Sequence, residues 1–372
     1  MSDNFDRKKE FQVKLKRTHQ YLDENNLDGV YLKKRSNFAW ITCGGDNRIV
    51  DHSELGWSGI LITKKNASII TDNTEMPRMV DEELGDLPLE KHKINWFKDE
   101  LGKAVIKYGS SKNIASDIQI EGLKELDSNF ERIQYKLTEQ EKNRFRELGK
   151  ETSKCFTKIA DQIELGMSEL DVAAIVSYEL FKKNIQPQLI LVAADNRISD
   201  YRHPIPTFNK IKQYIMYVTV AVKWGLNLSM TRFVHFGEVT NELKKKHEAI
   251  VNIDSRLILN TRPGKKLKEL FMEHTHNFEK FGYPDEWEKL HQGGSASYRI
   301  RDVKPNLNTP DSEIVMLNQA YAWNPSITGI KSEDTILINE EGNEIISEDK
   351  NWPLVKIYVD GKEIYRPGIY IK

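Results

Sequence analysis

The sequence predicts a mixed α/β protein of two domains, and three observations lead to this prediction. At 372 residues the chain is too long for one ordinary hydrophobic core and has the length of two. In its first third, short β-like runs alternate with helical stretches. Further along, the order helix, helix, β-hairpin occurs twice. We therefore assign residues 1–130 to an N-terminal α/β domain and residues 131–372 to a larger α+β domain.

The composition is that of a globular protein and excludes several classes. Hydrophobic residues make up 39% and charged residues 30% of the chain, and no apolar run approaches the roughly 20 residues of a membrane helix. A formal net charge of −1 gives no general affinity for nucleic acid or anionic membranes. The charged start predicts no signal peptide. Two cysteines, Cys43 and Cys155, exclude a disulfide framework, so we expect a cytoplasmic protein.

The N-terminal domain is predicted to open with an amphipathic helix over residues 7–24, where apolar side chains recur at helical spacing. Short β-branched and aromatic runs then predict strands. In chain order, the predicted strands are 29–32, 38–42, 59–63, 68–71 and 114–120. A polar, helix-biased stretch over 74–108 separates the last two strands, and residues 121–126 are helix-like.

A sharp helix start marks the entry to the second domain. Residues 127–136 carry no clear period and are interpreted as the connection. Thr138 precedes Glu141 by three residues, a capping box in which each side chain can satisfy a free backbone N–H of the other residue. A stripe of apolar residues follows, and a second helix is predicted from Ser168 to about Lys183.

The rest of the second domain alternates strands and helices. The predicted elements are a strand at 188–193, a hairpin at 214–237 that turns at 225–227, helices at 239–251 and 264–280, and a β-rich block at 312–339. Two other patterns are not interpreted as sites. His274 and His276 are two residues apart and would point to different faces of a helix. The pair Gly293-Gly294 lacks the spacing of a dinucleotide-binding loop.

Six segments in the second domain resemble the creatinase/aminopeptidase P/prolidase family, and they occur in the order of that family. They are the helix entry at 136–153, Tyr201–Pro204, Met230–Arg232, His291–Gly294, Ala322–Pro325 and Gly329–Thr335. The resemblance covers nearly all of residues 137–348. It implies the pita-bread fold, a curved antiparallel sheet backed by helices, and residues 1–130 resemble the creatinase-like N-terminal domain.

The peptidases of this family hold two divalent metals with two aspartates, one histidine and two glutamates, and most of this set is replaced here. The aligned positions carry, in order, Val218, Ser229, His291, Asn324 and Glu333. A one-residue alignment error would not restore the site, because residues 214–232 contain no Asp or Glu. One histidine and one glutamate cannot hold two such ions. We therefore expect no metal cofactor.

The retained polar residues suggest another chemistry. Creatinase itself hydrolyses a C–N bond without metal, by means of a proton-shuttling histidine that aligns with His203. Histidine suits this role because its unperturbed pKa near 6.5 lets it take and return a proton near neutral pH. His291 and Glu333 are the other two candidate catalytic residues. The alternatives are a locally hydrogen-bonded His203, a structural His291 and a Glu333 held in an ordinary ion pair.

Candidate substrate-binding residues follow from the same resemblance. Arg301 could bind a substrate carboxylate with two parallel hydrogen bonds, and Asn324 replaces a metal ligand. Arg202 and Arg232 are further candidates, although Arg232 could equally support the fold by ion pairing. In the family, a loop of the partner subunit's accessory domain can close the site. The candidate loop here is Gly44–Arg48. By this resemblance, we expect a homodimer.

The function expected from the sequence is a metal-independent, creatinase-like hydrolase or C–N lyase of a small carboxylate-bearing nitrogen compound. Thr231 stands where creatinase carries a second glutamate against the guanidinium of creatine, so a less cationic substrate is expected. Two alternatives stay open. One is an inactive pseudopeptidase that binds a peptide or protein, and the other is a divergent Xaa-Pro peptidase.

Overall fold

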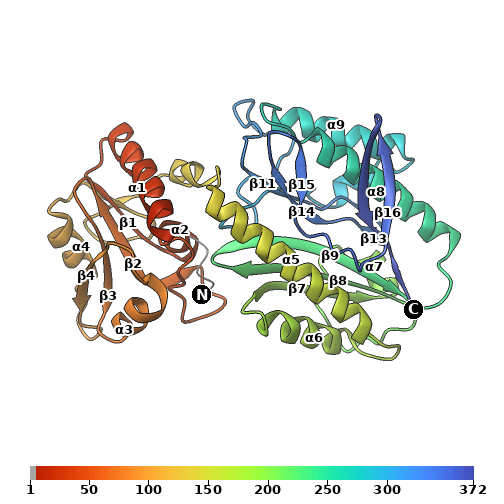
Figure 1. Cartoon of the computed structure of the whole chain (residues 1–372), viewed down its shortest axis with the longest axis horizontal. Coiled ribbons are helices and arrows are strands. Elements are labelled where there is room, and N and C mark those ends of the chain that lie inside the picture. The colour runs from red at the N-terminus through yellow and green to blue at the C-terminus, as the bar shows by residue number, and fades with distance from the viewer. Residues whose placement is uncertain (1–5) are drawn as a thin grey trace. The chain divides into compact units, whose positions relative to one another are not determined.

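The computed structural model describes residues 6–372, and the chain divides into two compact units (Figure 1). The first unit comprises Met1–Glu141 and Trp224–Leu226, and the second comprises Lys142–Lys223 and Asn227–Lys372. Within the described part of the chain, no helix is long and apolar enough to cross a membrane.

The first unit is built on a six-stranded sheet in the order β4-β3-β2-β1-β5-β6. Its strands are β1 (Gly29–Lys34), β2 (Leu55–Thr63), β3 (Ala67–Asp72), β4 (Glu90–Ile94), β5 (Ile114–Ser116) and β6 (Lys124–Glu125). Strand β1 pairs antiparallel with β2 and parallel with β5. The α-helices of this unit are α1 (Arg7–Glu24), α2 (Arg35–Ile41), α3 (Met76–Arg78) and α4 (Leu101–Gly109). Helix α1 has the predicted bounds.

Two predictions in this unit are wrong and a third is incomplete, each for a reason of tertiary context. The run at 38–42 is not a strand but lies mostly in helix α2, where Asn37 to Ile41 are all buried. An uninterrupted apolar run lacks the alternation that separates a strand from a buried helix. The helix-biased stretch 74–108 does contain α3, α4 and a π-helix at Met79–Leu84. It also contains strand β4, whose charged sequence hides its parallel pairing with β3. Residues 121–126 contain strand β6, which pairs with β5.

Helix α5 (Glu139–Gln162) begins with the predicted capping box. The backbone N–H of Thr138 donates to Glu141 Oε2 at 2.7 Å, and the N–H of Glu141 donates to Thr138 Oγ1 at 3.2 Å. A second capping box, formed by Ser168 and Asp171, starts helix α6 (Glu169–Phe181). Both helix starts are therefore confirmed, and each satisfies backbone donors that a helix leaves free.

The second unit contains two four-stranded sheets and two two-stranded ribbons. One sheet has the order β18-β9-β8-β7 and the other the order β10-β11-β14-β15. Their strands are β7 (Gln186–Ala194), β8 (Tyr214–Lys223), β9 (Leu226–His235), β10 (Gly293–Ser295), β11 (Ala320–Trp323), β14 (Asp334–Ile338), β15 (Asn343–Ile345) and β18 (Tyr370–Ile371). The ribbons pair β12 (Ser326–Ile327) with β13 (Ile330–Lys331) and β16 (Leu354–Val359) with β17 (Lys362–Pro367). The predicted hairpin is the β8–β9 pair.

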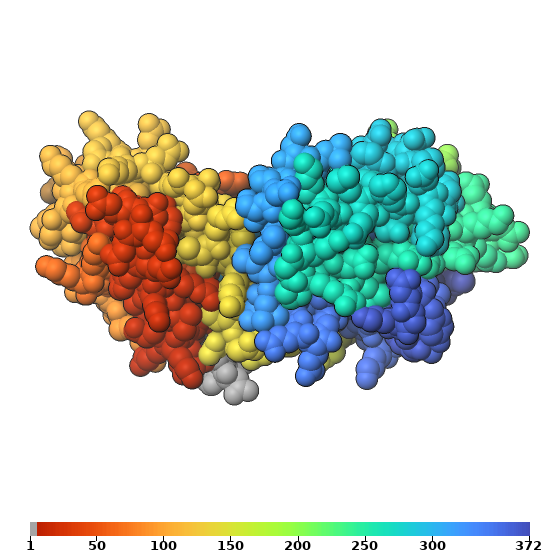
Figure 2. Space-filling view, turned by 90° about the horizontal axis from the view of Figure 1, so that it is seen from above, coloured from red at the N-terminus to blue at the C-terminus, as the bar shows by residue number. Residues whose placement is uncertain are grey.

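Helices and a hydrophobic core hold these strands in place. Besides α5 and α6, the α-helices are α7 (Asn196–Asp200), α8 (Asn241–Asn260) and α9 (Leu267–Lys280). Figure 2 shows the segment of α8 and α9, in green to cyan, over much of one face of this unit. Strand β9 also contacts the segment that leads into β14, because the Thr231 N–H donates to the Glu333 carbonyl at 3.2 Å. This contact brings together motifs that are about 100 residues apart in the sequence.

Candidate functional site

The structure brings three of the predicted site residues together in the second unit. His203 lies in the loop after α7, His291 directly precedes the turn into β10, and Glu333 lies between β13 and β14. The rings of His203 and His291 have centroids 6.0 Å apart. Both imidazoles also interact electrostatically with Glu333. Segments that are far apart in the sequence therefore converge on one polar cluster.

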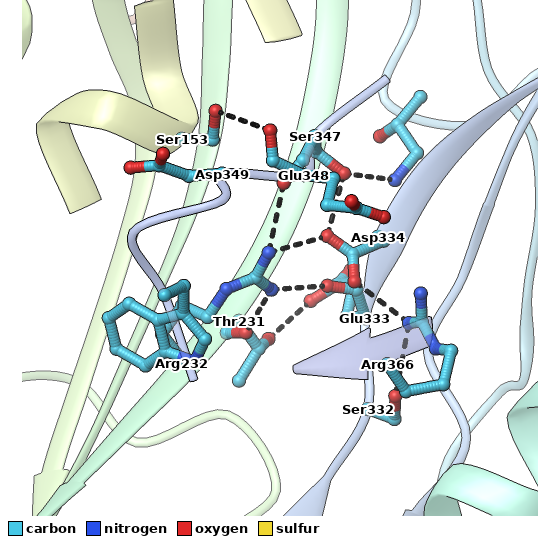
Figure 3. Close-up of polar contacts among 12 residues, drawn as sticks. Ser153, Thr231, Arg232, Ser332, Glu333, Asp334, Ser347, Glu348, Asp349 and Arg366 are labelled. Atoms are coloured by element: carbon cyan, nitrogen blue, oxygen red, sulfur yellow. Dashed lines mark hydrogen bonds and ion pairs between the residues drawn. The ribbon is translucent and has the colours of Figure 1, made fainter. Parts of the chain in front are cut away.

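Glu333 is the centre of this cluster, and both of its carboxylate oxygens are bound. Oε1 lies 3.2 Å from the guanidinium of Arg301, and Oε2 lies 2.8 Å from the ammonium of Lys331. The Thr231 hydroxyl donates to Oε2 at 2.6 Å (Figure 3). Burial by itself would raise the pKa of Glu333, but Lys331 and Arg301 outweigh it and hold the pKa below its usual value. Glu333 is therefore ionised at neutral pH.

Arg301 links two positions that the sequence resemblance aligns with metal ligands, Ser229 and Glu333. Its side chain is only 7% exposed, and besides Glu333 it donates to Ser229 Oγ at 3.0 Å. Lys331, which is equally buried, was not predicted from the sequence. Its position could have pointed to it, because residues two apart in an extended chain point to the same side, and Lys331 precedes Glu333 by two.

Both imidazoles are neutral near pH 7. Burial, followed by the charges of Arg301 and Lys304, lowers the pKa of His291 to about 4. Burial, followed by the charge of Lys331, also lowers the pKa of His203. The Gly293 N–H donates to His291 Nδ1 at 3.2 Å, so the neutral ring carries its proton on Nε2. His203 can thus accept a proton, and His291 can donate a hydrogen bond.

The two glycines after His291 are required by close backbone packing. Gly293 has φ +95°, and a Cβ there would lie 2.2 Å from the Ala322 carbonyl oxygen. Gly294 has φ +154°, and its Cβ would lie 1.9 Å from the Val303 carbonyl oxygen. No other residue fits either place without moving the backbone. The glycines therefore fix the loop that carries His291.

The other residues at the positions that the sequence resemblance aligns with metal ligands do not suit a metal pair. Val218 is buried in the hydrophobic core, where β8 pairs it with Leu191. Asn324 is buried, and its Oδ1 accepts no hydrogen bond from the described residues. Residues 6–372 contain no group of three or more His, Cys, Asp or Glu that could hold a metal ion. Because cations already occupy Glu333, a second pair of cations would meet repulsion there.

Two of the predicted substrate-binding arginines are held by the protein itself. The guanidinium of Arg232 is buried, lies 2.8 Å from Asp334 Oδ1, and donates to the Ser347 carbonyl at 2.9 Å (Figure 3). The guanidinium of Arg202 lies 2.6 Å from Glu286 and donates to Thr328 Oγ1 at 2.8 Å. These contacts favour a structural role for both arginines. For Arg232, this is the ion-pairing alternative that the sequence left open.

Two further sequence expectations concern residues outside the cluster. Arg48 lies in the first unit, where its side chain contacts Asp46 at 3.0 Å and Asp51 at 3.3 Å, so its role at a partner's site stays a prediction. His274 and His276 have separate partners: Nε2 of His274 pairs with the Gln292 side chain, and Nδ1 of His276 pairs with a backbone carbonyl. They do not form a metal pair.

Comparison with known proteins agrees with the sequence motifs. Residues 143–340 match the model of metallopeptidase family M24. The chain is 23% identical over 355 residues to an Xaa-Pro dipeptidase of Pyrococcus horikoshii, covering 90% of this chain and 97% of that protein. The structure of an Xaa-Pro dipeptidase from Bacillus anthracis superposes with a TM-score of 0.77 at 18% identity, covering 97% of this chain and 100% of that one.

The same fold also occurs outside the named dipeptidases. The N-terminal domain of the FACT complex subunit SPT16 from Cicer arietinum superposes with a TM-score of 0.69 at 12% identity, covering 91% of this chain and 96% of that one. The family model covers more than half of the chain, and the structural matches extend over both units. The chain therefore belongs to metallopeptidase family M24 and has the pita-bread fold of the prolidases.

Proposed function

We propose that this M24 member is a divergent Xaa-Pro-type peptidase that hydrolyses an amide C–N bond in a small carboxylate-bearing substrate, with His203 as the proton carrier. The observation that carries the proposal is a neutral, exposed His203 beside His291 and an ionised Glu333. The similarity to Xaa-Pro dipeptidases over 90% of the chain supports a short peptide-like substrate rather than creatine. Independence from metal is supported by the residues at the former ligand positions.

The proposed reaction needs a base and a hydrogen-bond donor. His203 removes a proton from water as the water oxygen bonds to the amide carbon, and it returns that proton to the departing nitrogen as the C–N bond breaks. The Nε2–H of His291 stabilises negative charge in the transition state. The cations Arg301 and Lys331 act electrostatically on His291 and His203, respectively. Glu333 holds both cations in place. This cluster replaces the hydroxide-generating role of a metal pair.

A second candidate function is ligand binding without turnover. The specific observation in its favour is that Arg301, Lys331 and Thr231 engage both oxygens of Glu333 and leave no free carboxylate in the cluster. The pseudopeptidase alternative would use the same site to hold a peptide. A homodimer in the cytoplasm, with residues 1–130 as the accessory domain, remains part of the proposal in either case.

Activity assays with controlled metal separate these candidates. The protein would be dialysed against a chelator and assayed on Xaa-Pro dipeptides and N-acyl amino acids, with and without added Mn²⁺ or Co²⁺. We expect turnover without metal and well under one equivalent of bound metal per chain. In His203→Ala the rate should fall by about 10²–10⁴-fold, the usual contribution of general acid–base catalysis. His276→Ala, at an exposed position, is the matched control.

The results of these assays distinguish between the candidate functions. Two bound metals and a strict requirement for Mn²⁺ would contradict the metal-independent mechanism and favour an ordinary M24 peptidase. Unchanged turnover in His203→Ala would remove His203 from the mechanism. Binding of these compounds without turnover under any condition would favour the second candidate.

A further inference from the structure

We propose that Arg301 and Lys331 form a built-in anion site that receives the carboxylate of the ligand at the place where family M24 is expected to hold its metals. The inference deepens the proposed function and rests on it only for the choice of a carboxylate as the anion. It assigns Lys331 as a ligand-binding residue.

The two cations approach Glu333 from different sides. Arg301 contacts Oε1 at 3.2 Å and Lys331 contacts Oε2 at 2.8 Å, so one carboxylate lies between a guanidinium and an ammonium. Both cationic side chains are 7% exposed. Arg301 is further fixed by Ser229 and by the Ile300 carbonyl at 2.6 Å. The site is therefore rigid and buried, as a preorganised binding site requires.

The charges of this cluster do not balance. Arg301 and Lys331 contribute two positive charges, and both contact the single carboxylate of Glu333. One positive charge therefore remains in a buried place. The carboxylate of Asp302, which also acts on Arg301, does not remove the excess, since it is matched by the charge of Arg299 at 3.5 Å. A buried uncompensated charge is costly, and one bound monoanion would remove the cost.

Unused hydrogen-bond donors accompany the unbalanced charge. The Lys331 ammonium carries three N–H donors, and within residues 6–372 the structure gives it one acceptor, on Glu333. The Nε of Arg301 is buried and has no acceptor among these residues. Charge-assisted hydrogen bonds to a carboxylate would use such donors. A carboxylate suits the single excess charge better than a phosphate dianion, which would leave the cluster negative.

The test compares two probes that differ only in the charged group, acetyl-L-proline and acetyl-L-prolinamide. Isothermal titration of the full chain should show that the acid binds about 10- to 100-fold more tightly than the amide, the range of one charge-assisted hydrogen bond. Lys331→Gln should abolish most of this preference while leaving the amide's affinity unchanged. The control is Lys304→Gln, which removes an exposed lysine near His291 and should retain the preference.

Several results would overturn the inference. They are equal affinities for acid and amide, a full preference for the acid in Lys331→Gln, or tighter binding of inorganic phosphate than of acetate. If Lys331→Gln does not fold, Arg301→Lys serves instead and should weaken the acid alone. The readout requires no turnover. Selective binding of the acid without hydrolysis would therefore contradict the proposed function but support the anion site. Turnover with no preference for the acid would support the proposed function but contradict the anion site.

Discussion

Glu333 and Asp334 are consecutive acidic residues, yet their carboxylates have different cationic partners. Figure 3 shows Arg232 and Arg366 beside Asp334. Asp334 lies 2.8 Å from Arg232 and 2.8 Å from Arg366, and Arg366 also contacts Asp254 at 2.5 Å. That cluster holds two positive and two negative charges. The cluster of Glu333 holds two cations against one carboxylate. Removing one partner from a balanced buried network leaves a charge unpaired and destabilises the fold, whereas the excess charge of an unbalanced cluster favours an anion.

Replacement of Arg366 is expected to cause the largest loss of folding stability among the changes considered for the two clusters. Arg366→Met keeps most of the side-chain volume but leaves Asp254 and Asp334 with less positive charge in a fully buried place. Burial already raises the pKa of Asp254, with Arg366 opposing it. Breaking such a pair on one side costs about 3–5 kcal/mol. Urea unfolding followed by tryptophan fluorescence measures this change, and a loss under about 1 kcal/mol would contradict a structural role.

His274 tests a third kind of buried polar group, one that is neutral. Its Nε2 pairs with Gln292 Oε1 at 3.0 Å, and its Nδ1 has no partner among the described residues, so a second proton would have no acceptor. Burial lowers the pKa of His274 from its usual 6.5 to about 4. Between these values the unfolded chain binds a proton that the folded chain does not. The contribution of His274 to the free energy of unfolding is therefore fully present above pH 6.5, and it is lost as the pH is lowered towards 4.

The size of this effect follows from the same two values. Between pH 7 and pH 5, His274 should cost the folded state on the order of 2 kcal/mol. His291, with a pKa of about 4, adds a loss in the same direction. Unfolding at both pH values, in wild type and His274→Gln, measures the difference, with His276→Gln as the exposed control. An unchanged pH dependence in His274→Gln would show that His274 is not the titrating group.

Replacement of Lys331 is expected to have the smallest effect on folding stability, in contrast to replacement of Arg366. Lys331→Met removes the excess cation and leaves Glu333 paired with Arg301 and Thr231. Because the lost ion pair is offset by the avoided cost of burying an ammonium, we expect a change within about 1 kcal/mol, or a gain in stability. The same urea unfolding measures it. A loss as large as that of Arg366→Met would show that both clusters are structural.

Much of the fold was determined by local sequence. The capping boxes at Thr138 and Ser168 set the starts of α5 and α6, because their hydrogen bonds join residues only three apart. The hairpin of β8 and β9 was predictable from β-branched runs around a turn. The spacing of His203, His291 and Glu333 within family motifs was enough to predict three members of the cluster. Local patterns of this kind depend little on the rest of the molecule.

Other features were decided only by tertiary structure. The apolar run of α2 and the charged strand β4 carry patterns that suit more than one conformation, so pairing with distant segments determined the outcome. Whether an arginine binds a substrate or supports the fold was likewise open in the sequence. Arg232 is held by Asp334, and Lys331 completes the site, because chain segments up to about 100 residues apart meet there. Charge balance is a property of such a meeting in space, and no local pattern contains it.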